Sequence, residues 1–147
     1  MLNNSIRWAV PLGSLVLALA LAPPASAQGP TYVVRADIPF DFQVGQQKLP
    51  AGEYRIQPFN LGAIAVSSVL PRTQHATSTV FPAGGGKIAE ETRLIFERYG
   101  DRYFLKQVWR AGTNTGAELP KTKDETAAIY RAGHAPERVV LEARTTR

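Results

Sequence analysis

The sequence predicts a mainly β domain, either an antiparallel β-sandwich or an open barrel, with about seven strands and one short C-terminal helix. Three observations predict this fold class. Apolar and polar residues alternate with period two in most segments, short turn sequences separate those segments, and one late segment has the capping residues of a helix. Sandwich and open barrel give the same alternation, so the sequence leaves the choice between them open.

The first expected strand covers residues 34–44, in which every second residue is apolar. Pro39 lies inside this run. Because proline cannot donate a ladder hydrogen bond, we expect the strand to lie at a sheet edge or to be broken by a bulge at this position. Residues 45–48 form the expected turn after it.

Three further strands are expected at residues 53–59, 63–69 and 75–81. Their alternation predicts which side chains face the core: Tyr54, Ile56, Ile64 and Val66. The glycine-rich run "PAGGGK" at residues 82–87 is the loosest expected loop.

The stretch "LIFERYGDRYFLKQVW" at residues 94–109 predicts a β-hairpin. Gly100-Asp101 suits a two-residue turn with glycine first, so Tyr99 should pair with Arg102. In that register one face holds most of the large apolar groups: Leu94, Phe96, Arg98, Tyr103, Leu105, Gln107 and Trp109. The other is the expected solvent face: Arg93, Ile95, Glu97, Tyr99, Arg102, Phe104, Lys106 and Val108. Lys106→Ala should therefore cost less than about 0.5 kcal/mol.

The last quarter of the chain contains the expected helix, at residues 123–132. Thr122 can cap it, Glu125 completes a capping box three residues later, and Gly133 can close it. The polar, glycine-rich residues 111–119 before it are expected to form a loop. After it we expect a final strand at residues 138–143 and a frayed end at 144–147.

The N-terminal 27 residues predict a secretory signal peptide. Arg7 precedes an uncharged apolar run at residues 9–22, and Ala25-Ser26-Ala27 has the small-residue pattern of a cleavage site. The alternative is an uncleaved anchor, but a run of 14 residues is shorter than the roughly 20 that a spanning helix needs. We expect cleavage after Ala27, which leaves one exported domain at residues 28–147 in the bacterial periplasm or outside the cell.

Composition restricts the classes of function that remain. The chain has no cysteine, which argues against a disulfide scaffold and excludes thiol and soft-metal chemistry. Removing residues 1–27, which hold one cation, lowers the formal charge from +5 to +4. The cations are spread along the chain, which indicates a solvated basic surface and makes nucleic acid an unexpected partner. Anionic lipids or polysaccharides and other envelope components remain as partners.

The sequence offers little catalytic machinery, and we expect no cofactor and no metal site. The chain has two histidines, and Pro136 rules out the helix on which His134 and Glu137 would form a ligand pair. His75 and Ser78 have opposite parity on one strand, so a serine triad is not expected. Asp37 and Asp41 share a strand face but lie roughly 13 Å apart, too far for a carboxylate pair. The run "AGGGK" lacks the spacing of a phosphate loop.

One candidate ligand surface remains, on the expected solvent face of the hairpin. Cationic and aromatic side chains alternate there and could grip a sugar or an anionic polymer. The candidate residues are Arg93, Tyr99, Arg102, Phe104 and Lys106. The alternative is an ordinary solvent face on which Glu97 balances part of the charge.

Three segments together carry a resemblance to a known group of proteins: "IPFDFQVGQQKLPAGEYRIQ" at 38–57, "RLIFERYGDRYFLKQVW" at 93–109 and "LPKTKDE" at 119–125. The chain resembles small exported proteins of uncharacterised function that are abundant in Acidobacteria. Thr122 stands where serine is commoner in that group, and both residues can cap a helix. The resemblance implies export and a β-rich fold, and it carries over no activity, substrate or site residue.

Three hypotheses for function follow. The first is a non-enzymatic exported domain that acts by binding or by structural contact. The second is a lipocalin-like carrier of a small hydrophobic ligand, with a pocket lined by Phe40, Phe42, Phe96 and Trp109. The third is a hydrolase whose carboxylate pair converges only in three dimensions.

Overall fold

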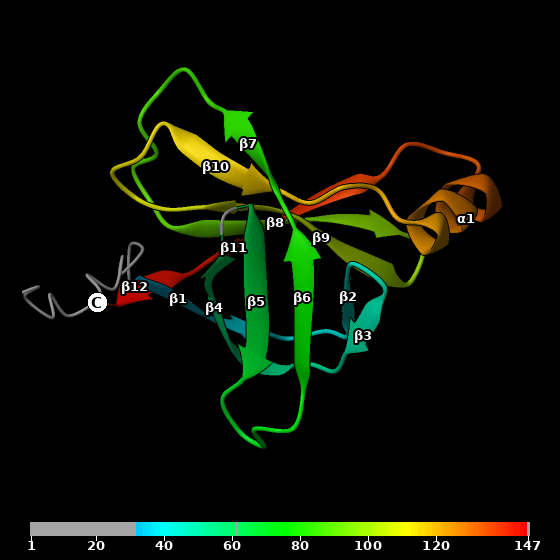
Figure 1. Cartoon of the computed structure of the whole chain (residues 1–147). Helices are drawn as coiled ribbons and strands as arrows, with labels where there is room; N and C mark the ends of the chain where they lie inside the picture. The colour runs from blue at the N-terminus through cyan, green and yellow to red at the C-terminus, as the bar shows by residue number, and fades with distance from the viewer. Residues whose placement is uncertain (1–31, 61, 147) are drawn as a thin grey trace, which may run out of the picture.

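The computed structural model describes residues 32–60 and 62–146 and contains two β-sheets and one helix. The expected signal peptide at residues 1–27 and its cleavage site lie outside the described residues. The mainly β fold class with one short helix is confirmed, and the two sheets form a sandwich that does not close into a barrel (Figure 1).

Sheet A has five strands in the order β12-β1-β4-β5-β6, and every pair in it is antiparallel. Its strands are β1 (Val33–Ile38), β4 (Gly52–Asn60), β5 (Ala63–Ser68), β6 (His75–Thr79) and β12 (Arg144–Thr146). The first and last strands of the described chain are therefore neighbours in one sheet.

Sheet B has seven strands, five of which follow the order β11-β8-β9-β10-β7. These are β7 (Phe81–Gly84), β8 (Arg93–Tyr99), β9 (Arg102–Trp109), β10 (Thr115–Glu118) and β11 (Glu137–Glu142). The other two are β2 (Phe42–Val44), which pairs with β9 in parallel, and β3 (Gln47–Leu49), which pairs with β2.

The described chain has five strands more than the expected seven. Three of them, β2, β7 and β12, form because the chain crosses between the sheets within or just after an expected strand, whereas β3 and β10 form where a turn at residues 45–48 and a loop at residues 111–119 were expected. Residues 39–41, with Pro39 at the break, carry it from β1 to β2. Val80 carries it from β6 to β7, and Figure 1 shows these two strands as one continuous rise from sheet A to sheet B. Ala143 carries it from β11 to β12, so the expected frayed end is a paired strand.

The main core lies between the two sheets. The predicted inward side chains Tyr54, Ile56, Ile64 and Val66 are confirmed as buried. Aromatic rings contribute edge-to-face contacts at the centre: Phe42 packs against Tyr54 at 5.0 Å and against Phe96 at 5.7 Å between centroids. Three of the four aromatic residues that would line a carrier's pocket, Phe40, Phe42 and Phe96, therefore pack together instead.

A β-bulge changes the expected register of the β8–β9 hairpin. Tyr99 pairs with Arg102 as predicted, and the register continues to Phe96 and Leu105. Ile95 then pairs with Gln107, so Lys106 is an extra residue on β9.

Beyond the bulge the faces of β9 exchange. Val108 joins the main core, and Trp109 lies on the outer face with Ala83, Ala89 and Ile95. The prediction that Trp109 faces the core and Val108 faces outward is wrong for this reason.

The outward-facing Trp109 explains why two glycine-rich segments pair as strands β7 and β10 rather than forming loops. The indole ring packs directly on the backbone at Gly85 and Gly116. A Cβ atom at Gly116 would lie 2.7 Å from Cδ2 of Trp109, and one at Gly85 would lie 2.8 Å from its Cη2. Glycine is required at both positions because the ring occupies the space of a side chain.

Helix α1 (Lys123–Ala132) has the predicted bounds. The side chain of Thr122 accepts a hydrogen bond from the backbone N–H of Glu125, and Gly133 closes the helix in the left-handed conformation. Only this half of the expected capping box is formed, because the carboxylate of Glu125 contacts Lys106 instead of the cap backbone. Figure 1 shows α1 at the end of sheet B where the β8–β9 turn lies.

We predict that Gly116→Ala lowers the free energy of unfolding by about 1–3 kcal/mol, since the added methyl overlaps the Trp109 ring and forces it to shift. Urea unfolding followed by Trp fluorescence measures this. The matched control is Gly84→Ala on the neighbouring strand, where an added Cβ meets no atom within 4 Å. Equal effects of the two substitutions would contradict the packing described for Trp109.

Candidate functional site

The five residues of the predicted ligand surface do not form one exposed face. Tyr99 and Phe104 are each 3% exposed and pack against Ala128 of α1. Lys106 is 5% exposed, whereas Arg93 is exposed and Arg102 is half-buried. The expectation that the second face of the hairpin is solvent is wrong for three of the five residues, because α1 covers that face.

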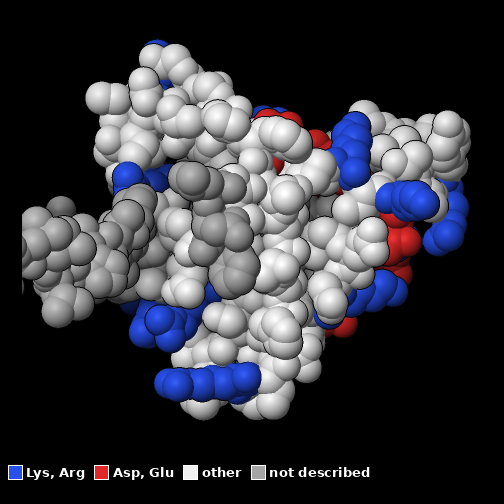
Figure 2. Space-filling view, in the orientation of Figure 1, with Lys and Arg blue, Asp and Glu red and all other residues white. Residues whose placement is uncertain are grey.

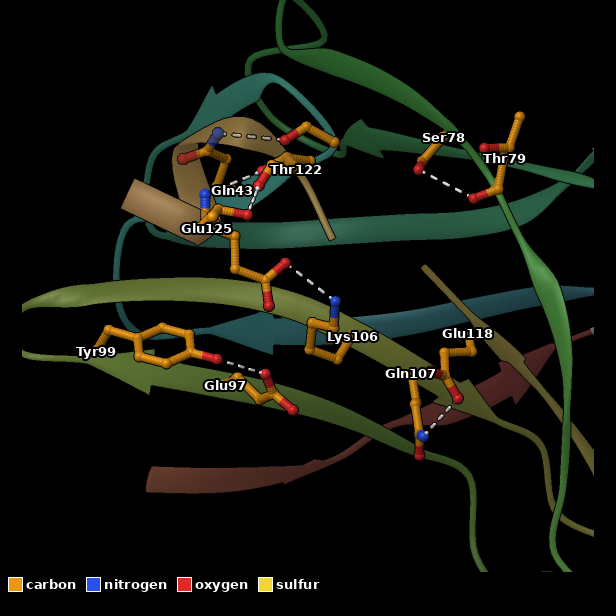
Figure 3. A network of polar contacts seen from close by, with 12 residues as sticks. Gln43, Ser78, Thr79, Glu97, Tyr99, Lys106, Gln107, Glu118, Thr122 and Glu125 are labelled. Atoms are coloured by element: carbon orange, nitrogen blue, oxygen red, sulfur yellow. Dashed lines mark hydrogen bonds and ion pairs between the residues drawn. The ribbon is translucent and has the colours of Figure 1, made fainter. Parts of the chain in front are cut away.

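A buried ion pair joins α1 to the sheet. The ammonium Nζ of Lys106 donates to Oε2 of Glu125 at 3.0 Å, and both side chains are almost fully buried (Figure 3). The bulge makes Lys106 the extra residue of β9. Its carbonyl accepts a hydrogen bond from the N–H of Leu119 at the start of the segment that leads to α1. The same residue therefore fixes both the path of the chain to the helix and the helix itself.

A second carboxylate lies beside this pair, on β8. The hydroxyl of Tyr99 donates to Oε2 of Glu97 at 2.8 Å (Figure 3). Burial raises the pKa of Glu125; Lys106 opposes this shift, and the negative charge of Glu97 reinforces it. Burial, the hydrogen bond to Glu97 and its charge also raise the pKa of Tyr99. We name Glu97, Tyr99, Lys106 and Glu125 the buried polar cluster.

The N-terminus of α1 is also tied to strands β2 and β9. The buried amide of Gln43 donates to Oδ2 of Asp124 at 2.8 Å, and its oxygen accepts from Nη2 of Arg102 at 3.0 Å. The guanidinium of Arg102 lies over the ring of Phe104, 5.1 Å from the centroid. Arg102, one of the predicted ligand residues, is thus engaged in holding α1 while it remains partly open to solvent.

Two surface depressions flank α1. One, of about 660 Å³, brings three cations together, Lys48, Arg102 and Arg131, with Asp41 and Asp101 at the same site. The other, of about 540 Å³, is lined by Glu97, Tyr99, Lys121, His134 and residues at the C-terminal end of α1. The three cations of the first depression come from β3, β9 and α1, and Lys121 of the second comes from the segment before α1. No local sequence pattern could have shown which of them share a depression.

The remaining catalytic candidates stay apart. His75 and His134 are both exposed, one on β6 and one after α1. Ser78 donates to the carbonyl of Thr79 rather than to a histidine. Among residues 32–60 and 62–146, no group of three or more histidine or acidic side chains could hold a metal ion.

Sequence reasoning missed the approach of Glu97 and Glu125. It assigned Glu125 to the helix cap and Glu97 to solvent. One signal could have found the contact: α1 has an apolar stripe of Ala128, Ile129 and Ala132, and the hairpin's second face carries two aromatic residues that could cover it. The carboxylate pair lies beneath the helix, where Glu125 is only 1% exposed. It is therefore closed to a substrate in this conformation.

Comparison with known proteins gives no match: no family model, no curated protein and no solved structure matches the chain. In the part of the chain that the structure describes, no helix is long and apolar enough to cross a bilayer. What the domain does must therefore be argued from the geometry around α1.

The expectation that Lys106→Ala costs less than about 0.5 kcal/mol is wrong because Lys106 is buried. We predict instead that it lowers the free energy of unfolding by about 3–5 kcal/mol at pH 8, since it leaves the buried carboxylate of Glu125 without its cation. Denaturant unfolding measures this. The control Lys123→Ala removes an exposed lysine from α1, the helix that carries Glu125. It should change the free energy of unfolding by less than about 0.5 kcal/mol.

The double variant Lys106→Met/Glu125→Met should recover much of the loss, since it removes both buried charges together. A loss for Lys106→Ala no larger than that for Lys123→Ala would contradict the buried ion pair.

Proposed function

We propose that the chain is an exported, non-enzymatic β domain that acts in the periplasm or outside the cell through binding contact with an envelope component. The observation that carries this proposal is the use of the acid and base groups. The most deeply buried ones, Lys106 and Glu125, contact each other and hold α1 on the sheet. Groups employed in this way stabilise the fold rather than face a substrate.

The carrier and hydrolase hypotheses have less support. A carrier needs an apolar cavity, but Phe42 and Phe96 are buried against each other and Trp109 lies outside the main core. A hydrolase with a carboxylate pair needs both groups open to substrate, but Glu125 lies beneath α1. The binding hypothesis needs only an accessible surface.

The contact surface we propose is the 660 Å³ depression beside α1, which we name the cationic depression. Lys48 and Arg131 are exposed there, and Arg102 is half-buried. One of its two acids, Asp41, already accepts a hydrogen bond from the backbone N–H of Ala51 at 2.9 Å. Figure 2 shows Lys and Arg side chains around acidic ones at the end of the molecule that carries α1.

This arrangement fits an anionic polysaccharide of the envelope. Three cations from three elements, two exposed and one half-buried, can contact successive negative groups of a polymer, and the long side chains of lysine and arginine adapt to irregular spacing. The chain's net positive charge adds a weak attraction over a longer range.

The first prediction concerns export. In the native host, the protein recovered from the periplasm or the medium should have an intact mass that begins at Gln28, because signal peptidase cleaves after Ala27. Intact-mass spectrometry of cell fractions measures this. A full-length mass confined to the cytoplasm would overturn the localisation.

The second prediction concerns the cationic depression. The mature domain should co-sediment with isolated envelope polysaccharide and bind polygalacturonate, a soluble anionic probe, with affinity that falls as salt rises. Lys48→Ala/Arg131→Ala should weaken binding at least fivefold because it removes two of the three cations.

The matched control is Arg72→Ala/Lys87→Ala, which removes two exposed cations elsewhere and should weaken binding less than twofold. Equal losses for the two double variants would mean that only net charge matters. Absence of binding to either polysaccharide by the wild-type domain would remove the proposed partner.

A further inference from the structure

Three ionisable side chains from three elements meet beneath α1: Glu97 of β8, Lys106 of β9 and Glu125 of α1. Lys106 is bonded to Oε2 of Glu125, and Tyr99 to Oε2 of Glu97. The other oxygen of Glu125, Oε1, is fully buried and has no hydrogen-bond partner. With all groups ionised, two carboxylates face one ammonium, and the cluster carries one uncompensated negative charge.

An unpaired carboxylate oxygen in a buried site is costly, since it has lost its hydrogen bonds to water. A proton on Oε1 removes this cost. It neutralises the excess charge, and it converts an acceptor without a partner into a donor for Glu97. Figure 3 shows Glu125 projecting from α1 toward the strands that carry Lys106 and Glu97.

We propose that the Glu97–Glu125 pair binds one proton, and that this proton latches α1 onto sheet B. The surrounding charged groups are consistent with this reading. Asp124 on α1 is bonded to Gln43, and Arg102 of β9 donates to the carbonyl of Asp124. Lys121 and His134 line the depression over Glu97 without a hydrogen bond to either carboxylate among the described contacts.

The direction of the pH effect follows from the environment of Glu125. Its pKa is raised in the folded protein, mainly by burial, so the folded state holds a proton that the unfolded chain would release. Stability from this proton is fully present below the ordinary pKa of a glutamate. It is lost as the pH rises through the raised value. The helix is therefore held most firmly in acid and less firmly in neutral or alkaline medium.

When the proton is lost, α1 keeps few other contacts that hold it on the sheet. The apolar contacts of α1 are Ala128, Ile129 and Ala132 against Tyr99 and Phe104. Helix release uncovers those two aromatic rings and Lys106, which is most of the cationic and aromatic face that the sequence predicts. Proton loss thus links the pH of the medium to the exposure of this face.

Amide hydrogen exchange tests the latch. Protection factors of α1 at residues 127–132, corrected for intrinsic exchange, should fall between pH 5.5 and pH 8, by up to tenfold per pH unit above the pair's pKa because one proton is released. In Glu125→Gln the side-chain carbonyl can accept from Lys106 and the NH₂ can donate to Glu97. Protection should then be independent of pH.

The matched control is Glu90→Gln, an exposed glutamate in the segment between β7 and β8, and it should keep the wild-type pH dependence. Amides of β4 and β5 report global unfolding and separate it from release of the helix. Constant protection in the wild type, or an unchanged pH dependence in Glu125→Gln, would overturn the proposal.

A direct titration decides the matter if Glu125→Gln fails to fold. Carbon-13 NMR of the wild-type side-chain carboxyls should show a raised pKa for Glu125. An ordinary glutamate pKa for Glu125 would overturn the latch while leaving the polysaccharide proposal intact, since the cationic depression does not depend on this residue.

Discussion

The β-bulge at Lys106 is the constraint on which packing on both faces of sheet B depends. One extra residue on β9 lets Leu105 and Val108 both face the main core, although their spacing would put them on opposite faces of a regular strand. It also turns Trp109 to the outer face, where the ring orders β7 and β10. The bulged residue itself points beneath α1 and meets Glu125. Removing the bulge would disturb the core, the outer tryptophan cluster and the helix together.

Elements defined by local signals could be predicted from the sequence, and those defined by distant contacts could not. Helix α1 has the predicted bounds because each of its caps is local: Thr122 accepts from the N–H of Glu125 at one end, and the N–H of Gly133 donates to the carbonyl of Ile129 at the other. The hairpin turn at Gly100 is equally local. By contrast, the pairing of β7 with β10 depends on the ring of Trp109, and the burial of Lys106 depends on a carboxylate 19 residues away. The alternation of apolar and polar residues assigned the two faces of the hairpin correctly near the turn. It could not show that α1 covers the face that carries Tyr99 and Phe104.

Acid–base side chains serve architecture in this domain. Burial of a charged lysine or glutamate costs free energy, which only a close partner of opposite charge offsets. Here each partner comes from a different element, Lys106 from β9 and Glu125 from α1. The result is a helix attached by a buried ion pair as well as by apolar contacts. The exposed cations beside the same helix supply the contact surface that we propose. Helix α1 is thus next to both the buried ion pair and the exposed cations of the proposed contact surface.

The pairing of the first and last strands sets an order on assembly of the domain. Val33 of β1 lies opposite Thr146 of β12, at the two ends of the described chain. A ribosome or an export channel delivers the polypeptide from its N-terminus, so β1 emerges early. It cannot pair with β12 until nearly all of the domain has followed. Sheet A keeps one open edge during that interval, and an open edge can pair with another chain. A domain built in this way gains from a chaperone at the exit. The two ends of the described chain lie side by side, which makes this part a good candidate for circular permutation.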